Sequence, residues 1–596
     1  MDKKEKCVYQ FGPFRLDSAE HLLVCGGQRV YLTPKDFEIL LLLIKNRGHI
    51  LEKEELMKEV WPDAFVEEGN LNRHISTIRK NLSEHHGKRE YIETIPRRGY
   101  RFIAHVQDLR DEDTRAMGNE RAGALVRANE ANARTRPFDS LAVLPLVNAS
   151  ADQSVEYLSE GITDSVINIL SRLPHLRVMA RSTVSRYKGR EVDPQEVAQE
   201  IGVSAVMVGR LLEFGKNLIV KVELVDAEDG SQLWGEQYSR KSTDIFAIQE
   251  EISQKIAKKL RLRLTDEQKR RLTKRHTQST EAYQSYLMGL LLLNKRTPDS
   301  LRNSIKHFER AIKLDRQYAL AYVGLAQSYH HLSDYNLVSH EISLHKVREM
   351  ALHAIQLDPD LAEARIALAY IRRYAWDWAG MEEEYLAAIK ISPNLAVAHK
   401  YYSTLLRQTG RFEESFAEIR KAQELDPISP NIMATASANF YFARQYERAL
   451  KEILKVIELE PSMPSGHFVA GWIYTQQERY AEAIEAFQKA GSLLEYDNPE
   501  ITSNLACAYA LSGKTKKARQ LLSQLLERSQ REDAHSYHIA LIYTALRDQE
   551  QAFTYLERAY EEHSPELGYL RADPLLDSLR ADARFVSLLR RVGFVS

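Results

Sequence analysis

Basic side chains that could bind the phosphates of a nucleic acid are concentrated in one short segment near the start of this 596-residue chain. Residues 69–106 carry a net charge of +5, whereas residues 51–68 directly before them carry −5. The basic residues lie on a helical pattern at 70–82 and around the turn Pro96-Arg97-Arg98-Gly99. A helix fits the major groove of DNA and a two-stranded ribbon tip fits the minor groove, so this pattern predicts a local DNA-binding surface.

Several predicted elements must position these basic side chains. Ile75, Ile78 and Leu82 recur at helical spacing, which predicts that they hold the helix to its domain while Arg73, Thr77 and Lys80 face outward. The rest of residues 1–106 alternates strand and helix patterns. We expect strands at 11–16 and 28–32, helices from Thr33-Pro34 and at 52–60, and a hairpin of strands at 91–95 and 100–106.

The order of these motifs over residues 9–106 resembles the winged-helix domain of OmpR/PhoB-type regulators, and most closely that of ToxR- and CadC-like transcriptional activators. The matching segments are 32–40 for the first helix, 56–61 for the second, 70–82 for the recognition helix and 92–102 for the wing. The resemblance implies a winged helix-turn-helix fold and double-stranded promoter DNA as the partner.

The resemblance also implies which side chains contact DNA. Recognition-helix contacts would come from Asn70, Asn72, Arg73, His74, Ser76, Thr77, Arg79 and Lys80, and wing contacts from Thr94, Arg97, Arg98, Tyr100 and Arg101. Of these, Asn70, Arg73 and Thr77 fall on base-facing positions. Thr77 stands where some relatives carry a base-reading arginine, so no operator sequence is implied. The alternative is that the arginines form an ordinary solvated surface.

Two further segments lie between this domain and the C-terminal half. Residues 107–137 lack aromatic residues and are rich in Ala, Arg, Asp and Glu, which predicts a flexible polar linker. Residues 138–265 alternate strand and helix patterns and predict a small α/β domain. At 158–164, 177–182, 232–236 and 244–249 this domain resembles the N-terminal domain of TolB and FlgO. We expect it to be structural or to sense a small ligand.

Residues 280–596 are predicted to be almost wholly helical and repetitive. Pro359, Pro393, Pro427 and Pro461 are each 34 residues apart, which is typical of tetratricopeptide repeats, pairs of antiparallel helices stacked into a solenoid. We expect a C-terminal cap after the repeats and a concave groove that binds a protein or peptide. The predicted lining residues of that groove are Tyr401, Tyr402, Tyr441 and Tyr474.

The sequence shows no convincing catalytic, cofactor or metal site. Gly513-Lys514-Thr515 is part of a nucleotide-binding pattern, but Ala508 stands where the first glycine belongs and the tripeptide aligns with a repeat turn at Gly410. The three cysteines are too few for a four-thiolate zinc site. No apolar run reaches the ~20 residues of a membrane span, so we expect a cytoplasmic protein that uses no cofactor, metal or membrane.

These features together predict a soluble one-component transcriptional regulator that is not an enzyme. Its winged helix would bind promoter DNA as a homodimer, and its repeats would receive a protein or peptide signal. One alternative is a tetratricopeptide scaffold or adaptor whose winged helix contacts protein. Another is a cyclase-associated regulator, which would need a catalytic segment that the sequence does not leave room for. Strongly salt-dependent binding to duplex DNA separates the first hypothesis from the adaptor.

Overall fold

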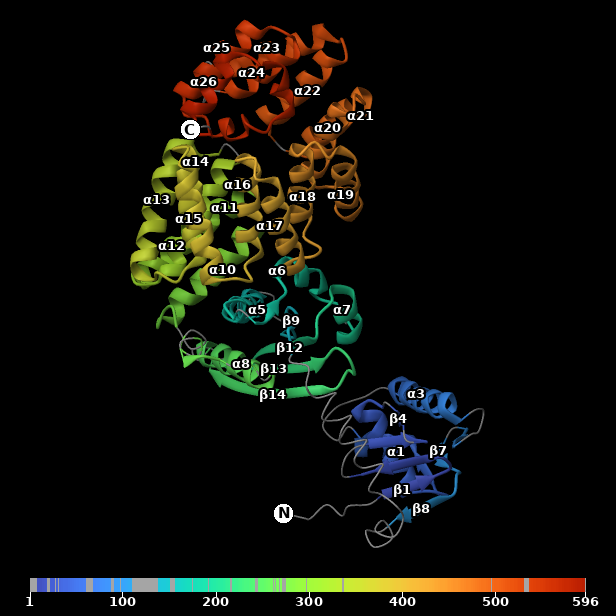
Figure 1. Cartoon of the computed structure of the whole chain (residues 1–596). Helices are drawn as coiled ribbons and strands as arrows, with labels where there is room; N and C mark the ends of the chain where they lie inside the picture. The colour runs from blue at the N-terminus through green and yellow to red at the C-terminus, as the bar shows by residue number, and fades with distance from the viewer. Residues whose placement is uncertain are drawn as a thin grey trace. The chain divides into compact units, whose positions relative to one another are not determined.

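The computed structural model describes residues 8–594, with gaps. The residues that it does not describe within this range are 19–21, 27, 31, 61–67, 87–90, 97, 110–137, 151–155, 174, 191, 215–216, 242–244, 261, 263, 267, 269, 271–274, 296, 335–336, 495 and 530–534. The chain divides into two compact units, Met1–Arg136 and Pro137–Ser596 (Figure 1).

The N-terminal unit begins with an antiparallel sheet. Its strands are β1 (Val8–Phe11), β2 (Phe14–Asp17), β3 (Leu22–Cys25), β4 (Gln28–Val30) and β8 (Val106–Leu109), in the order β4-β3-β2-β1-β8. The sequence predicts one strand at 11–16, but a turn at Gly12, with φ of +54°, divides it into the β1–β2 hairpin. Strand β8 extends to Leu109, past the predicted start of the linker, and the remainder of that linker lies outside the described residues.

Three helices and a second, small sheet complete this unit. They are α1 (Pro34–Lys45), α2 (Lys53–Val60), α3 (Glu68–His86), β5 (Ile50–Glu52), β6 (Ile92–Ile95) and β7 (Gly99–Phe102). A capping box of Thr33 and Asp36 starts α1. A side chain at Gly99 would place its Cβ 1.9 Å from the carbonyl oxygen of Leu51, so the β5–β7 pairing requires glycine there. The predicted winged helix-turn-helix fold is confirmed.

The middle domain, at the start of the second unit, is built on a mixed sheet. Its strands are β9 (Ser140–Val143), β10 (Val147–Asn148), β11 (Arg177–Val178), β12 (Ala205–Phe214), β13 (Asn217–Asp226) and β14 (Gln232–Lys241). The order is β11-β9-β12-β13-β14, parallel on the β11 side and antiparallel on the β14 side. Its helices are α5 (Glu156–Ser171), α6 (Arg181–Val184), α7 (Pro194–Ile201) and α8 (Ile245–Lys259). The predicted α/β class is confirmed, although the strand expected at 177–184 ends at Val178 and α6 follows.

The remainder of the second unit is a run of paired helices. They are α10 (Thr280–Lys295), α11 (Pro298–Leu314), α12 (Ala319–Asp334), α13 (His340–Leu357), α14 (Ala362–Tyr374), α15 (Trp378–Ile391), α16 (Ala396–Gln408), α17 (Phe412–Leu425), α18 (Pro430–Phe442), α19 (Tyr446–Leu459), α20 (Pro464–Gln476), α21 (Tyr480–Ser492), α22 (Pro499–Leu511), α23 (Thr515–Ser529), α24 (Ser536–Ala545) and α25 (Gln549–Glu561). Successive helices pack against each other, as the predicted solenoid requires (Figure 1). No helix among the residues described is both long and apolar enough to span a membrane.

The turn between the two helices of a repeat has a recurring left-handed residue. Trp376, Gly410, Arg444 and Glu478 are 34 residues apart and have φ of 51°, 79°, 64° and 60°. This conformation caps the carbonyl end of the preceding helix. Gly513 has φ of 78° in the equivalent turn before α23, so the Gly513-Lys514-Thr515 stretch is a repeat turn.

The segment after α25 folds back onto much earlier repeats. It contains the 3₁₀ helices η5 (Pro565–Tyr569) and η6 (Pro574–Leu579) and helix α26 (Ala583–Arg591). The Trp378 indole donates to the carbonyl oxygen of Val592 at 2.8 Å and stacks on Phe594 at 4.9 Å. Arg444 donates to the carbonyl oxygen of Ala572 at 2.7 Å. The C-terminal segment therefore contacts the array at two separate places, at Trp378 in α15 and at Arg444 in the turn after α18. In Figure 1 it lies beside α14.

The middle domain and the repeats share one hydrophobic core, although the sequence predicts separate domains at 138–265 and 280–596. Two repeat turns hold the middle domain as well. Asn394 lies next to the repeat proline Pro393. Its side-chain nitrogen Nδ2 donates to the carbonyl oxygens of Ser171, Leu173 and Leu176 at 3.3, 2.8 and 2.8 Å. Asp426, next to Pro427, accepts hydrogen bonds from the hydroxyls of Ser182 and Thr183. We call this contact region the junction.

Candidate nucleic-acid interface

Helix α3 has one buried face and one exposed face. Leu71, Ile75, Ile78 and Leu82 are at most 1% exposed and pack in the core of the N-terminal unit. On the other side, Asn72, Arg73, Ser76 and Lys80 are exposed, and His74, Thr77 and Arg79 are half-buried. The sequence pattern predicted this division, because an apolar residue at every third or fourth position faces the core.

His74 links α3 to the start of α1. Its Nδ1 lies 2.8 Å from Oδ1 of Asp36, a carboxylate that is only 1% exposed. The other oxygen of Asp36 accepts a hydrogen bond from the Thr33 hydroxyl at 2.6 Å in the capping box. The resemblance implied a DNA contact at His74, and in the structure this side chain connects the two helices.

Arg79 joins α3 to the hairpin. Its guanidinium donates to the carbonyl oxygen of Ile92 at 3.2 and 2.8 Å and to the hydroxyl of Thr94 at 2.6 Å. The same group lies 6.0 Å from the centre of the Tyr100 ring. Because both strands of the hairpin contact it, Arg79 fixes the position of the wing relative to α3.

Tyr100 and Asn72 form a second link. Tyr100, which the resemblance placed among the wing contacts, is only 4% exposed and packs in the core of the N-terminal unit. Its hydroxyl donates to Oδ1 of Asn72 at 2.5 Å, which orients that exposed amide. The hydroxyls of Ser76 and Thr77 donate to backbone carbonyls one helical turn earlier, at 2.9 and 3.1 Å.

Some of the remaining predicted residues have an intramolecular partner, some have none among the described residues, and some lie outside the described residues. Arg101 contacts Glu93 on the neighbouring strand at 2.5 Å. The guanidinium groups of Arg73 and Arg98 are exposed and form no hydrogen bond or ion pair with any described residue. Arg97 and the side chain of Asn70 lie outside the described residues. The exposed face of α3 and the hairpin turn therefore offer Arg73 and Arg98 to a ligand, on a framework held by Arg79, Tyr100 and His74.

Comparison with known families agrees with this geometry. A family model described as "Transcriptional regulatory protein, C terminal" matches residues 27–102. The N-terminal domain is an OmpR/PhoB-type winged helix. A model described as the second domain of HilA/YgeH-like transcriptional regulators matches residues 138–256, and tetratricopeptide-repeat models match residues 439–492, 474–539 and 536–562. The resemblance of the middle domain to TolB and FlgO stays a prediction.

Individual relatives share different parts of the chain. The transcriptional regulator HilA of Salmonella typhimurium is 25% identical over 408 residues, 68% of each chain. A putative adenylate cyclase 3 of Rhizobium meliloti is 31% identical over 187 residues, and the chain spans 32% of its length. The winged helix alone is similar to KdpE of Mycobacterium tuberculosis, with 32% identity over 101 residues, 17% of this chain and 45% of that protein. Among solved structures, the DNA-binding domain of Escherichia coli CadC is similar over 18% of this chain and 98% of its own, with 24% identity and a TM-score of 0.17.

The tyrosines predicted to line the repeat groove do not form one open surface. Tyr402 and Tyr441 are 6% and 2% exposed, so both belong mainly to the core. Tyr402 donates to Glu382 at 2.6 Å. Tyr401 and Tyr474 are half-buried and lie under Lys400 and Arg479, at 4.0 and 4.5 Å from the ring centres.

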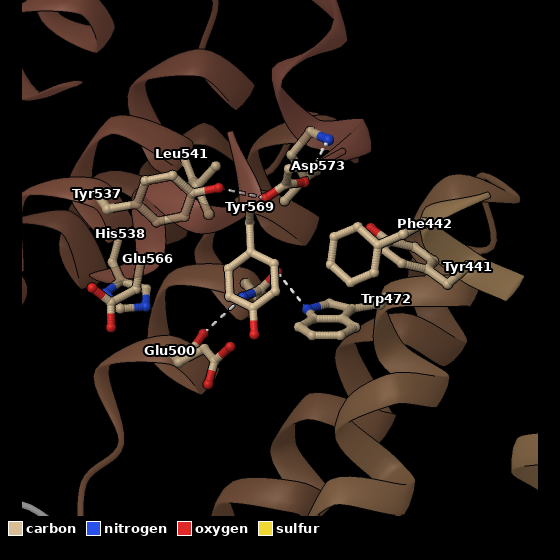
Figure 2. Close-up of a pocket in the computed structure, with 12 residues that line it drawn as sticks. Tyr441, Phe442, Trp472, Glu500, Tyr537, His538, Leu541, Glu566, Tyr569 and Asp573 are labelled. Atoms are coloured by element: carbon tan, nitrogen blue, oxygen red, sulfur yellow. Dashed lines mark hydrogen bonds between the residues drawn. The ribbon is translucent and has the colours of Figure 1, made fainter. Parts of the chain in front are cut away.

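Tyr441 lines a small cavity of about 20 Å³ that the C-terminal segment closes. Figure 2 shows Tyr569 of η5 projecting between Trp472 and Tyr537, with the Glu500 carboxylate below it. Burial raises the pKa of Glu500 to about 7, and the nearby charge of Glu566 adds to this effect. At Tyr441 the chain's own C-terminal segment therefore covers one of the four side chains that the sequence assigned to a partner-binding groove.

Sequence reasoning missed two arginines that support this closure. Arg407 lies 4.7 Å from the centre of the Phe442 ring and 5.8 Å from that of Tyr569, and Arg373 lies 5.9 Å from Tyr569. Arg373, Arg407 and Tyr441 are 34 residues apart, so the repeat period could have placed the three side chains in one column. Within the described residues, no group of three or more His, Cys, Asp or Glu side chains could hold a metal ion.

Proposed function

We propose that this protein is a transcriptional regulator that binds promoter DNA through α3 and the β6–β7 hairpin. The observation that carries the proposal is the exposed pair Arg73 and Arg98, which have no described intramolecular partner while their neighbours are fixed. Uncommitted guanidinium groups on a rigid scaffold suit contacts to base edges and phosphates. The net charge of +5 on residues 69–106 supplies the electrostatic attraction.

We assign separate roles to the predicted contact residues. Arg73, with Asn70 and Thr77, would face base edges, and Ser76 and Lys80 would lie near phosphates. Arg97 and Arg98 at the hairpin turn would enter the minor groove, where arginine is favoured. Thr94, Arg79, Tyr100 and His74 would act mainly by holding the hairpin and α3 in place, since each has an intramolecular partner.

The remaining proposals concern the protein as a whole. We infer a cytoplasmic regulator without enzymatic activity that binds neighbouring half-sites as a homodimer, because one small module buries limited surface on DNA. The repeats would bind a protein or peptide on the part of the array that the C-terminal segment leaves open.

The experiment is a salt titration of duplex binding by the full chain, with DNA from upstream of its own coding sequence as the probe. The logarithm of the binding constant should fall linearly with the logarithm of salt concentration, with a slope of about −0.9 for each phosphate neutralised. Binding that is absent in dilute buffer, or that does not change with salt, would reject DNA binding and favour the adaptor alternative.

A further inference from the structure

A second cavity lies inside the unit Pro137–Ser596, where the middle domain meets the first repeats. Its volume is about 80 Å³, and it is bounded by α5 and α8 on one side and by α10, the start of α12 and α14 on the other. The cavity is separate from the winged helix, so its role does not depend on the proposed DNA binding.

One wall of this cavity is a row of aromatic rings. The ring of Phe246 lies 4.7 Å from that of Tyr283, Tyr283 lies 6.5 Å from Tyr286, and Tyr286 lies 5.1 Å from Tyr318, measured between centroids. The wall combines residues from both domains, because Phe246 belongs to α8 and Tyr283 and Tyr286 to α10. A ligand that packs on it would contact the middle domain and the repeats at once.

Two hydroxyls on this wall are uncommitted. The Tyr283 hydroxyl contacts Ser165 at 2.8 Å and accepts a hydrogen bond from Gln249. Tyr286 and Tyr318 are only 7% and 1% exposed, yet their hydroxyls form no hydrogen bond with a described residue. Burial raises the pKa of both phenols, so each stays neutral and can donate. Both tyrosines line the cavity, so their hydroxyls can form hydrogen bonds with a polar ligand there.

The cavity also presents charges of both signs. Arg172, directly after α5, and Glu363 on α14 line it, and neither forms an ion pair with a described residue. Both act on the pKa of Tyr286, Glu363 raising it and Arg172 lowering it, so both charges lie near that hydroxyl. Asp164 pairs with Arg181 through one oxygen, while its other oxygen is buried without a hydrogen-bond partner. The other ionisable lining residues have partners: Arg275 lies 3.4 Å from Glu250, and His276 lies 3.3 Å from Asp358.

We propose that this cavity binds a small zwitterion of the amino-acid type, with its carboxylate at Arg172, its ammonium group at Glu363, and the hydroxyls of Tyr286 and Tyr318 as further partners. A simple anion would face the Glu363 carboxylate, which has no ion-pair partner among the described residues, and the buried oxygen of Asp164 that accepts no hydrogen bond. A simple cation would face Arg172. A molecule that carries both charges pairs with both, and the aromatic wall accommodates its apolar part.

Binding can be tested on the full chain by thermal unfolding in the presence of each common L-amino acid at millimolar concentration. A ligand that binds only the folded state raises the melting temperature. We expect at least one amino acid to do so, and its N-acetyl and carboxamide derivatives to bind at least about tenfold more weakly in calorimetric titration. If no amino acid raises the melting temperature, or if both derivatives bind as well as the parent, the proposal is wrong.

Variants locate the site. Arg172→Gln and Glu363→Gln should each weaken binding of the effective amino acid by at least about tenfold. Tyr318→Phe keeps the ring and removes only the hydroxyl, so it should fold normally and weaken binding several-fold. Arg302→Gln, an exposed arginine on α11, is the matched control and should change nothing. Equal binding by the control and all three cavity variants would place the ligand elsewhere and overturn the proposal.

Discussion

The outward face of α3 and the junction between the middle domain and the repeats are both polar, but they use their polar side chains in opposite ways. At the junction, Asn394 and Asp426 are 8% and 4% exposed, and each holds two or three groups of the middle domain. On α3, Arg73 is exposed and has no partner among the described residues. Buried polar groups must be satisfied inside the molecule, whereas exposed ones can keep their hydrogen bonds for a ligand. The presence of an intramolecular hydrogen-bond partner thus distinguishes structural polar residues from binding residues of the same type.

The largest effect is expected from Asn394→Asp at the junction. The change keeps the shape of the side chain but replaces a donor with an acceptor that faces three carbonyl oxygens. The free energy of unfolding should fall by about 3 kcal/mol, because a buried charge without a donor is left. Chemical denaturation followed by tryptophan fluorescence measures it.

The matched control for this change is Asn303→Asp on the exposed face of α11. There the amide oxygen already accepts from Lys306 at 3.0 Å, so a carboxylate is tolerated. We expect a change within about 0.5 kcal/mol. An equal loss of stability in both variants would mean that the hydrogen bonds of Asn394 at the junction stabilise the protein no more than those of a surface side chain.

On the other side of the comparison, Arg73→Ala should leave stability within about 0.5 kcal/mol of the parent protein. Its affinity for the cognate duplex should fall by about 1–3 kcal/mol if the side chain reads a base. Fluorescence anisotropy with specific and unrelated duplexes measures this, with Arg420→Ala on the exposed face of α17 as the control. Equal weakening on all duplexes would make Arg73 a phosphate contact instead.

Arg79 lies between the two classes and sharpens the distinction. Arg79→Ala should lower the free energy of unfolding of the winged helix by about 1–2 kcal/mol, because the hydrogen bonds to Ile92 and Thr94 are lost, and should also weaken DNA binding. Arg79→Lys keeps the charge but not the forked geometry, so it should recover the salt dependence without full stability. If Arg79→Ala weakens DNA binding without lowering stability, Arg79 is a DNA-binding residue like Arg73 and not a structural one.

The smallest effect concerns Glu500 in the cavity of Figure 2. Its pKa is about 7 in the folded state against an ordinary 4.5, so the folded protein keeps a proton that the unfolded chain releases. This contribution to stability is fully present below pH 4.5 and is lost as the pH rises through 7. Glu500→Gln should remove this dependence and raise stability by about 1 kcal/mol near about pH 8. Parallel pH profiles of the two proteins would contradict the burial of this carboxylate.

The sequence predicted the fold class of each part, because the signals for helices and repeats are periodic and local. The stripe of Ile75, Ile78 and Leu82 identified the buried face of α3, and the spacing of Pro359 and Pro393 identified the repeats. It did not predict the β1–β2 turn at Gly12, since the adjoining strands read as one continuous apolar pattern. Nor did it predict the shared core or the folding back of the C-terminal segment, which depend on contacts between residues about 200 positions apart.

For the candidate interface, the sequence identified the residue types but not which side chains are buried or have an intramolecular partner. Tyr100 and His74 were predicted to face DNA because of their positions in the motif, whereas the structure buries the first and pairs the second with Asp36. A partner such as Asp36 lies 38 residues away, so no local pattern reveals it. The specific contacts with DNA stay predictions.

The two turns that grip the middle domain belong to successive repeats, at Asn394 and Asp426. Their separation is set by the stacking of α15 to α17, so it changes whenever the solenoid tightens or relaxes its superhelical pitch. Asn394 holds the end of α5 and Asp426 holds α6, so a change in pitch would alter the distance between two points at which the middle domain is held.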